Sequence, residues 1–217
     1  AARRFAPKAR LFQASSAAVF GRPEVSPQDE GTAIRPSSPY GAAKAYTQFV
    51  AANYRDTHGM HVSCGIFYNH ESIRRPPDFV TRKVTLAAAR IKAGLQQELV
   101  LGDLDAVRDW GFAGDYVRAA WLTLQSDAPG DYIIASGKGR TVRDLVEAAF
   151  SAAGLDWRSY VRRDEAFVRQ EGGLPLIGDP AKARARLGWT PAVSFERMIQ
   201  EMVENDLASN RQEIQAR

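Results

Sequence analysis

The chain of 217 residues is poor in cysteine and has no long hydrophobic stretch. Its single cysteine, Cys64, excludes an internal disulfide framework, and one thiol is too few for most zinc sites. No uninterrupted apolar run approaches the ~18 residues that a membrane-spanning helix needs. We therefore expect no membrane partner and no metal, and a location in the reducing cytoplasm.

The sequence also lacks a strong charge of one sign. Lys and Arg number 29 against 25 Asp and Glu, which gives a net charge of +4. Residues 1–10 contain four basic residues and no acidic one, so the rest of the chain is close to neutral. This basic run fits the solvated end of a helix that leads into a strand. The run contains a single aromatic residue, Phe5, so aromatic and basic residues do not alternate along it, which argues against a nucleic-acid partner.

What the chain does contain is a pattern of alternating strands and helices. The apolar run 11–16 predicts a buried strand, and residues 40–58 have the spacing of a helix that ends at Gly59. Residues 61–68 predict a second strand after that helix. A strand, a helix and a strand in this order form a βαβ unit, which predicts an α/β fold with a parallel sheet. Further helices are expected over 79–94, 115–125, 141–154, 180–187 and 194–208, with strands over 99–101 and 132–135.

The most informative motif is the pair Tyr40 and Lys44, four residues apart on the predicted helix. This spacing places both side chains on one helical face, where the lysine ammonium favours the phenolate form of the tyrosine. Such a pair can take a proton from a sugar hydroxyl while a hydride leaves the same carbon. Ser16 ends the first predicted strand, where parallel sheets bind ligands, and could bond the reacting oxygen. A surface Tyr/Lys pair is the alternative interpretation of this spacing.

The motifs around these residues resemble those of the GDP-mannose 4,6-dehydratase-like enzymes, a branch of the extended short-chain dehydrogenases/reductases with a Rossmann-like sheet. The similar segments are FQASSAAVFG, RPSSPYGAAKAY, FYNHESIRRPPDFVTRKV, LGDLDAVRDWGFAGDYVRAAWLTLQ and GDPAKARARLGWTP, which together extend over nearly the whole chain. The resemblance implies a lyase that uses NADP, or alternatively NAD, on a GDP-hexose. It also implies a homo-oligomer in the complete enzyme.

The resemblance implies roles for individual residues. Ser16, Tyr40 and Lys44 would be catalytic, and Tyr40 and Lys44 would also contact the cofactor. The remaining implied contacts are Asn69 to substrate and cofactor, Glu71 to cofactor, and Val80, Lys83, Arg108 and Arg169 to the nucleotide diphosphate. Arginine suits phosphate because its guanidinium can donate two parallel hydrogen bonds.

For several of these residues a simpler interpretation stays open. Arg108 could pair with Asp109, and Lys83 could be a solvated helix residue. His70 fits a structural hydrogen-bonding histidine better than a catalyst. Three tryptophans are expected in the core: Trp110, Trp121 and Trp189.

The chain departs from the family pattern at three places. Ala18 stands two residues after Ser16, where the dehydratases have a Glu that serves the elimination of water. A 4-ketoreductase or a 4-epimerase needs no such residue. Arg169 is followed by Gln-Glu-Gly in place of the usual continuation. No Gly-rich turn of the kind that cradles a cofactor pyrophosphate is present.

We therefore expect residues 1–70 to be the remaining part of a Rossmann-like domain that lacks its cofactor-binding half. Residues 71–217 would be mostly a nucleotide-sugar-binding region, with some elements returning to the Rossmann sheet. The expected activity is dehydration of a GDP-hexose, with hydride transfer at C4 and loss of water across C5–C6. The alternatives are a 4-ketoreductase, a 4-epimerase, or a fragment that binds a nucleotide sugar or a partner without catalysis.

Overall fold

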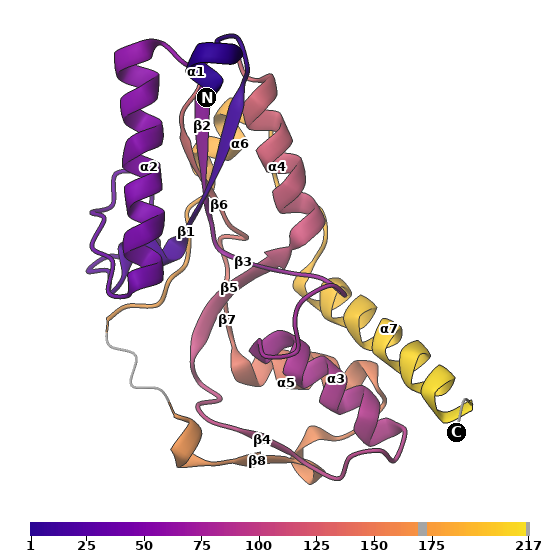
Figure 1. Ribbon diagram of the computed structural model, residues 1–217. Helices are drawn as coiled ribbons and strands as arrows, with labels where there is room; N and C mark the ends of the chain where they lie inside the picture. Colours follow the sequence, from indigo (N-terminus) through magenta and orange to yellow (C-terminus); the bar gives the residue numbers. More distant parts are fainter. Residues whose placement is uncertain (169–172, 216–217) are drawn as a thin grey trace. The chain divides into compact units, whose positions relative to one another are not determined.

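The computed structural model describes residues 1–168 and 173–215 (Figure 1). The chain divides into two compact units, each assembled from three separate stretches of sequence. Unit 1 consists of Ala1–His70, Asp109–Gly139 and Gly172–Ala192, and unit 2 of Glu71–Arg108, Arg140–Glu171 and Val193–Arg217.

Unit 1 is built on a parallel sheet of three strands. These are β1 (Leu11–Ser16), β2 (Val62–Phe67) and β6 (Asp131–Ile134), in the order β1-β2-β6. In the register, Ser16 lies opposite Phe67 of β2, and both pairings are parallel. The long helix α2 (Pro39–His58) joins β1 to β2, as Figure 1 shows. The predicted βαβ unit and the α/β fold class are confirmed.

Local sequence signals explain both ends of α2. Ser38 precedes the helix, and its hydroxyl accepts a hydrogen bond from the backbone N–H of Gly41 at 3.1 Å. Pro39 occupies the first turn, where its missing N–H costs nothing. Gly59 ends the helix in the left-handed conformation, with φ at 60°. The helix therefore begins one residue before the predicted start and ends at the predicted residue.

Shorter elements complete each unit. Unit 1 also contains α1 (Ala2–Phe5), the 3-10 turn η1 (Ala17–Phe20), α4 (Ala113–Gln125) and α6 (Ala181–Leu187). Unit 2 contains α3 (Val80–Lys92), α5 (Val142–Ala152), α7 (Phe195–Gln215), the parallel strands β4 (Leu99–Leu101) and β8 (Val161–Arg163), and the 3-10 turns η2 (Trp157–Ser159) and η3 (Glu165–Phe167). The chain passes between the units within β3 (Asn69–Glu71), β5 (Val107–Phe112) and β7 (Gly139–Thr141), which pair in the order β3-β5-β7.

The core of unit 1 lies around the sheet and includes the fully buried Phe20, Tyr116 and Trp189. Trp110 is also buried, as expected, but the expectation for Trp121 is wrong because this side chain is 58% exposed. Tyr116 and residues at helical spacing from it form the buried face of α4. Trp121 falls on the opposite face of the helix.

Capping residues mark the starts of α5 and α7. Thr141 caps α5 in a capping box with Asp144, so the predicted cap is confirmed. Ser194 accepts a hydrogen bond from the N–H of Arg197 at 3.1 Å and so starts α7, which extends beyond its predicted end.

Within residues 1–168 and 173–215, none of the helices has both the length and the apolar character that spanning a bilayer requires.

Candidate active site

Ser16 lies at the carboxyl end of β1, where the chain turns into η1. Its Oγ accepts a hydrogen bond from the backbone N–H of Ala18 at 3.2 Å. The bond uses a lone pair of the hydroxyl, so Ser16 keeps its own hydrogen to donate to a ligand. Ligands of open parallel sheets bind at the carboxyl ends of the strands, which is where this hydroxyl stands.

Tyr40 and Lys44 lie one turn apart at the start of α2. The Lys44 ammonium is 5.7 Å from the centre of the Tyr40 ring, so the expected proximity of cation and phenol is present in the fold. Lys44 Nζ also donates to the backbone carbonyl of Ala14 in β1 at 2.9 Å. An ammonium has three N–H donors, and this bond uses one of them. Tyr40 is 58% exposed, which leaves its hydroxyl open to a ligand.

A close backbone contact holds the start of α2 against η1. A Cβ atom added to Gly41 would lie 2.5 Å from the carbonyl oxygen of Ala18 and 3.1 Å from Cβ of Pro36. Only glycine allows the helix to approach this near. Gly41 follows Tyr40 directly, and Ala18 is bonded to Ser16. The contact therefore sets how Tyr40 and Ser16 lie relative to each other.

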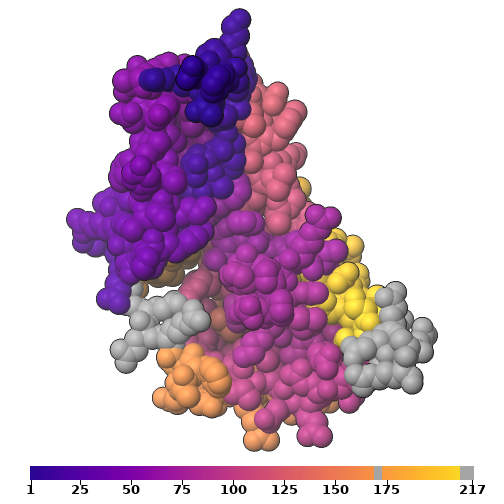
Figure 2. Space-filling model, in the orientation of Figure 1, coloured from indigo at the N-terminus to yellow at the C-terminus, as the bar shows by residue number. Residues whose placement is uncertain are grey.

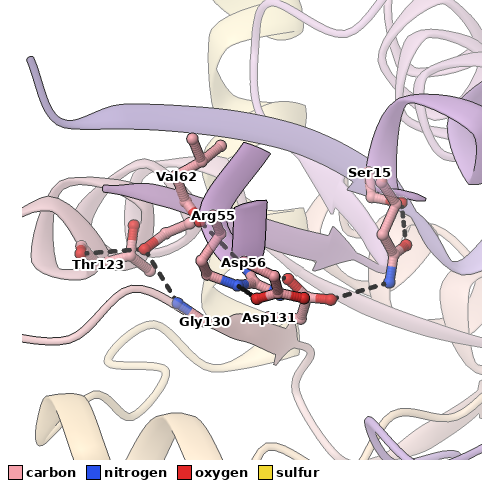
Figure 3. Close-up of polar contacts among 9 residues, drawn as sticks. Ser15, Arg55, Asp56, Val62, Thr123, Gly130 and Asp131 are labelled. Atoms are coloured by element: carbon pink, nitrogen blue, oxygen red, sulfur yellow. Dashed lines mark hydrogen bonds and ion pairs between the residues drawn. The ribbon is translucent and has the colours of Figure 1, made fainter. Parts of the chain in front are cut away.

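A partly buried polar network fixes α2 along the rest of its length (Figure 3). Ser15 donates to Gln48 Oε1 at 2.9 Å, and Gln48 lies 3.5 Å from a carboxylate oxygen of Asp131. Asp131 also pairs with Arg55 at 2.8 Å, and Arg55 donates to the carbonyl of Val62 at 3.1 Å. The helix is thus tied to all three strands of the unit 1 sheet, and it cannot slide along β1 without breaking these bonds.

Asn69 and His70 follow β2 on the ligand side of the sheet. Asn69 Nδ2 donates to the backbone carbonyl of Asp109 at 3.2 Å, which fixes the orientation of the amide. His70 Nδ1 lies 2.9 Å from the carbonyl of Tyr68, and because a carbonyl only accepts, Nδ1 is the protonated nitrogen. The imidazole stacks on Tyr116, with ring centres 5.3 Å apart. This agrees with the structural interpretation of His70.

Glu71 lies in unit 2 and is only 1% exposed. Its carboxylate accepts a hydrogen bond from Thr81 Oγ1 at 2.7 Å and pairs with Arg75 Nε at 3.1 Å. The Arg75 guanidinium in turn lies 3.5 Å from the centre of the Phe79 ring. Burial raises the pKa of Glu71, and the bonds to Thr81 and Arg75 oppose that rise. The structure thus shows Glu71 holding the start of α3.

The residues implied for nucleotide binding come later in the sequence than the catalytic residues. Those that the structure describes lie in unit 2. Val80 is the first residue of α3, and Lys83 follows on its next turn. Lys83 Nζ donates to the carbonyl of Val100 at 2.9 Å and lies 5.5 Å from the centre of the exposed Phe167 ring. Lys83 is therefore bonded within unit 2 and is not a purely solvated residue.

Arg108 ends the first stretch of unit 2, and its guanidinium donates to the carbonyl of Val107 at 2.7 Å. Arg169 lies outside the described residues. The ring of Phe167, two positions earlier in the chain, contacts Lys83.

Asp109 was not singled out as functional from the sequence, and the structure shows it to be a central residue. It is fully buried, and its carboxylate accepts four hydrogen bonds, two from Ser136 and one each from Gly137 and Gly178. A lone acidic residue inside a buried strand was the signal that could have identified it, because buried carboxylates need partners.

No metal site or reactive thiol accompanies these residues. In the two described stretches, no three His, Cys, Asp or Glu side chains come close enough to hold a metal ion. Burial raises the pKa of the Cys64 thiol to about 12, so Cys64 stays protonated near neutral pH and is no nucleophile.

Comparisons with known proteins identify the family of the chain and its fold. The family model of the GDP-mannose 4,6 dehydratases matches residues 1–202. GDP-mannose 4,6 dehydratase 2 of Arabidopsis thaliana is 45% identical over 204 residues, which cover 94% of this chain and 54% of the relative. GDP-mannose 4,6-dehydratase of Yersinia enterocolitica is 41% identical over 232 residues, with 94% and 62% covered. The chain thus spans little more than half the length of these relatives.

Solved structures show the same fold. RMD from Pseudomonas aeruginosa, complexed with NADPH, superposes with a TM-score of 0.88 at 22% identity, covering 95% of this chain and 69% of that one. DesIV, a dTDP-glucose 4,6-dehydratase from Streptomyces venezuelae with NAD and TYD bound, gives a TM-score of 0.78 at 28% identity, covering 94% and 61%. The Rossmann-like fold expected from the motifs is therefore confirmed.

Proposed function

We propose, because this chain belongs to the GDP-mannose 4,6 dehydratase family, that it forms the catalytic and nucleotide-sugar-binding part of a GDP-mannose 4,6-dehydratase. The reaction removes a hydride from C4 of the hexose and a proton from its hydroxyl. Water is then lost across C5–C6, and the hydride returns to C6 while C5 gains a proton. The product is a 4-keto-6-deoxy sugar, and no net oxidant is consumed.

The observation that supports this proposal is the arrangement of Tyr40, Lys44 and Ser16 in unit 1. The nearby Lys44 ammonium stabilises the phenolate form of Tyr40, and this phenolate accepts the proton of the C4 hydroxyl. Ser16 donates its hydroxyl hydrogen to the same sugar oxygen. The bond from Lys44 to Ala14 and the contact of Gly41 with Ala18 hold these groups in place, which is the positioning that such a step requires.

NADP, or alternatively NAD, supplies the hydride acceptor when bound. The reacting end of such a cofactor fits this site, because Lys44 uses one of its N–H donors on Ala14 and keeps two for ribose hydroxyls. The Asn69 amide can bond the cofactor or the substrate. Glu71 would support cofactor binding indirectly, because it holds the start of α3 in place. This sequence contains no Gly-rich pyrophosphate cradle, and we assign none of its residues to that part of the cofactor.

Unit 2 supplies the proposed nucleotide contacts. Lys83 brings a positive charge to the middle of β4 and to the ring of Phe167, and Arg108 adds a guanidinium that can bind a diphosphate. Val80 and Arg169 complete the set taken from the family pattern. We accordingly assign residues 1–70 to the Rossmann-like domain and residues 71–217 mostly to binding of a GDP-hexose, with some segments returning to the sheet.

Ala18 favours a second candidate function. Its methyl group can neither remove the C5 proton nor protonate the departing C6 hydroxyl. The Ser16, Tyr40 and Lys44 set alone is sufficient for a 4-ketoreductase or a 4-epimerase. Incubating the complete protein with GDP-mannose and NADP decides between them. Formation of the 4-keto-6-deoxy product supports dehydration, whereas reduction of a 4-keto sugar supplied with NADPH, without dehydration of GDP-mannose, supports the alternative.

The absent pyrophosphate cradle favours a third candidate, a binding module without catalysis. Titrating NADPH against the purified chain by fluorescence separates this possibility from the others. We expect weak or no binding by the chain alone. Tight binding would show that the chain holds the whole cofactor unaided, which contradicts the inference from the absent cradle.

The outer face of α2 supports a homo-oligomeric complete enzyme. Tyr46, Phe49, Val50 and Tyr54 are exposed at helical spacing on that face, while Gly41, Ala45, Gln48 and Ala51 are buried. This helix belongs to the purple part of the surface drawn in Figure 2. A second copy could cover such a row of aromatic side chains. Sedimentation of the protein and of its Phe49→Ser variant tests this: a monomeric wild type would contradict it.

We propose the cytoplasm as the location of the complete enzyme. The buried free thiol of Cys64 is compatible with a reducing compartment. Fractionation of cells that produce the protein checks this assignment, and recovery in a membrane or secreted fraction would contradict it.

A further inference from the structure

The carboxylate of Asp109 joins two loops on the ligand side of the unit 1 sheet. Its Oδ1 accepts from the N–H and the hydroxyl of Ser136, at 2.9 and 2.6 Å. Its Oδ2 accepts from the N–H of Gly137 at 3.0 Å and of Gly178 at 3.2 Å. Ser136 and Gly137 follow β6, so the carboxylate bridges the start of β5 to the segment after β6 and to Gly178.

The same residue holds Asn69 through its backbone. Asn69 Nδ2 donates to the Asp109 carbonyl at 3.2 Å, and Asn69 follows β2, the strand next to β6. With one amide hydrogen fixed, Asn69 presents its Oδ1 and its second hydrogen in a set direction. A shift of the Asp109 backbone would turn this amide away from that direction.

The packing at Gly178 leaves little room for such a shift. A Cβ atom there would lie 2.5 Å from Cβ of Ala135 and 2.7 Å from the ring of Tyr68. Tyr68 directly precedes Asn69, and its hydroxyl donates to the buried Gln28 at 2.9 Å. The segment after β2, the segment after β6 and residue 178 thus meet at one buried point.

We propose that Asp109 is a positioning residue that acts through Asn69: it fixes the direction in which the Asn69 amide meets a bound nucleotide sugar. The part of this proposal that concerns the ligand rests on the function proposed above. The part that concerns the orientation of Asn69 rests on the hydrogen bonds of Asp109 alone. The four hydrogen bonds that this buried carboxylate accepts all come from the chain itself, so they hold the neighbouring segments in place.

Asp109→Asn removes the bridge while keeping the size of the side chain. Whichever way the new amide turns, its NH2 group faces at least one backbone N–H, so a donor meets a donor. Ser136→Ala is milder, because it removes only the hydroxyl bond. Ser126→Ala is the matched control: its hydroxyl bonds the carbonyl of Ala128 and is remote from Asp109 in the hydrogen-bond network.

The first measurement needs no ligand. The side-chain NH2 signal of Asn69 in a 15N NMR spectrum is identified by its loss in Asn69→Ala. We expect this signal to shift or broaden in Asp109→Asn and in Ser136→Ala, but not in Ser126→Ala. An unchanged Asn69 signal in folded Asp109→Asn overturns the proposal. If Asp109→Asn does not fold, Ser136→Ala decides in its place.

The second measurement is the affinity for GDP-mannose in a double-mutant cycle. We expect Asp109→Asn to weaken binding about tenfold in the wild-type background, as for the loss of one buried hydrogen bond, and less than about twofold in Asn69→Ala. An equal loss in both backgrounds shows a general structural role and overturns the proposal. If the wild-type chain binds no GDP-mannose, the proposed function loses support, while the NMR signal still decides the role of Asp109.

Discussion

Replacing Gly41 with alanine tests whether the contact of α2 with η1 sets the geometry of the catalytic residues. The new Cβ would lie 2.5 Å from the Ala18 carbonyl oxygen, whereas ordinary contact begins at 3.4 Å. Helix and turn must therefore separate by about 0.9 Å, the difference between these two distances. Because the obstacle is a backbone oxygen, no side-chain rotation relieves it.

Two opposing effects determine the stability of this variant. Overpacking costs about 1–3 kcal/mol, whereas alanine in place of glycine in a helix gains up to about 1 kcal/mol. We expect the free energy of unfolding to fall by about 1–2 kcal/mol. Activity should be more sensitive, because a misplacement of about 1 Å can lower turnover about 100-fold. Urea denaturation of the chain and turnover of the complete protein measure the two effects.

Gly31→Ala is the control for this experiment. A Cβ atom at Gly31 would meet only a carboxylate oxygen of Asp29, at 3.4 Å, and the backbone there has no positive φ. We expect this variant to resemble the wild type in both assays. The reasoning is refuted if Gly41→Ala retains wild-type stability and turns over within about twofold of the wild type.

The other predictions concern catalysis, a buried ion pair and the thiol. Tyr40→Phe in the complete protein should abolish hydride transfer, measured by cofactor absorbance, and retained turnover would exclude Tyr40 as the base. Arg82→Met leaves the buried Asp206 without its ion-pair partner and should lower the free energy of unfolding in urea by about 3–5 kcal/mol. Arg197→Ala breaks an exposed ion pair and should lower it by less than about 1 kcal/mol. Equal losses in the two variants would contradict the reasoning. Burial raises the pKa of Cys64 from its ordinary value of 9.0 to about 12, so the unfolded chain releases this proton first and stability should fall as pH rises above 9.0. The slope should be shallower in Cys64→Ala by up to about 1.4 kcal/mol per pH unit, and identical slopes would refute it.

The sequence predicted those features that depend on neighbouring residues. Strand β1, the ends of α2 and the cap Thr141 all follow from local apolar spacing and from capping residues, and the structure shows each within about two residues of its expected place. The close approach of Lys44 and Tyr40 follows from helix geometry in the same way.

Features that depend on distant parts of the chain were missed. The strands β3 and β7 have three residues each, too few for an alternating pattern to be visible. The contact of Gly41 with Ala18 joins elements that only the folded sheet brings together, and the bonds of Asp109 reach residues 136 and 178. The expectation that Trp121 is buried rests on its apolar ring alone. Its position along α4 places it on the exposed face of that helix.

The division of unit 1 into separate stretches constrains the order in which the chain can fold. Trp189 fills the core of this unit and donates its indole N–H to the carbonyl of Asp115 at 2.9 Å, yet it is synthesised after most of unit 2. Until it leaves the ribosome, the Tyr116 ring that it packs against lacks this partner. Folding of unit 1 must therefore wait until residue 189 has been synthesised, which prolongs exposure of its core to aggregation and to chaperones.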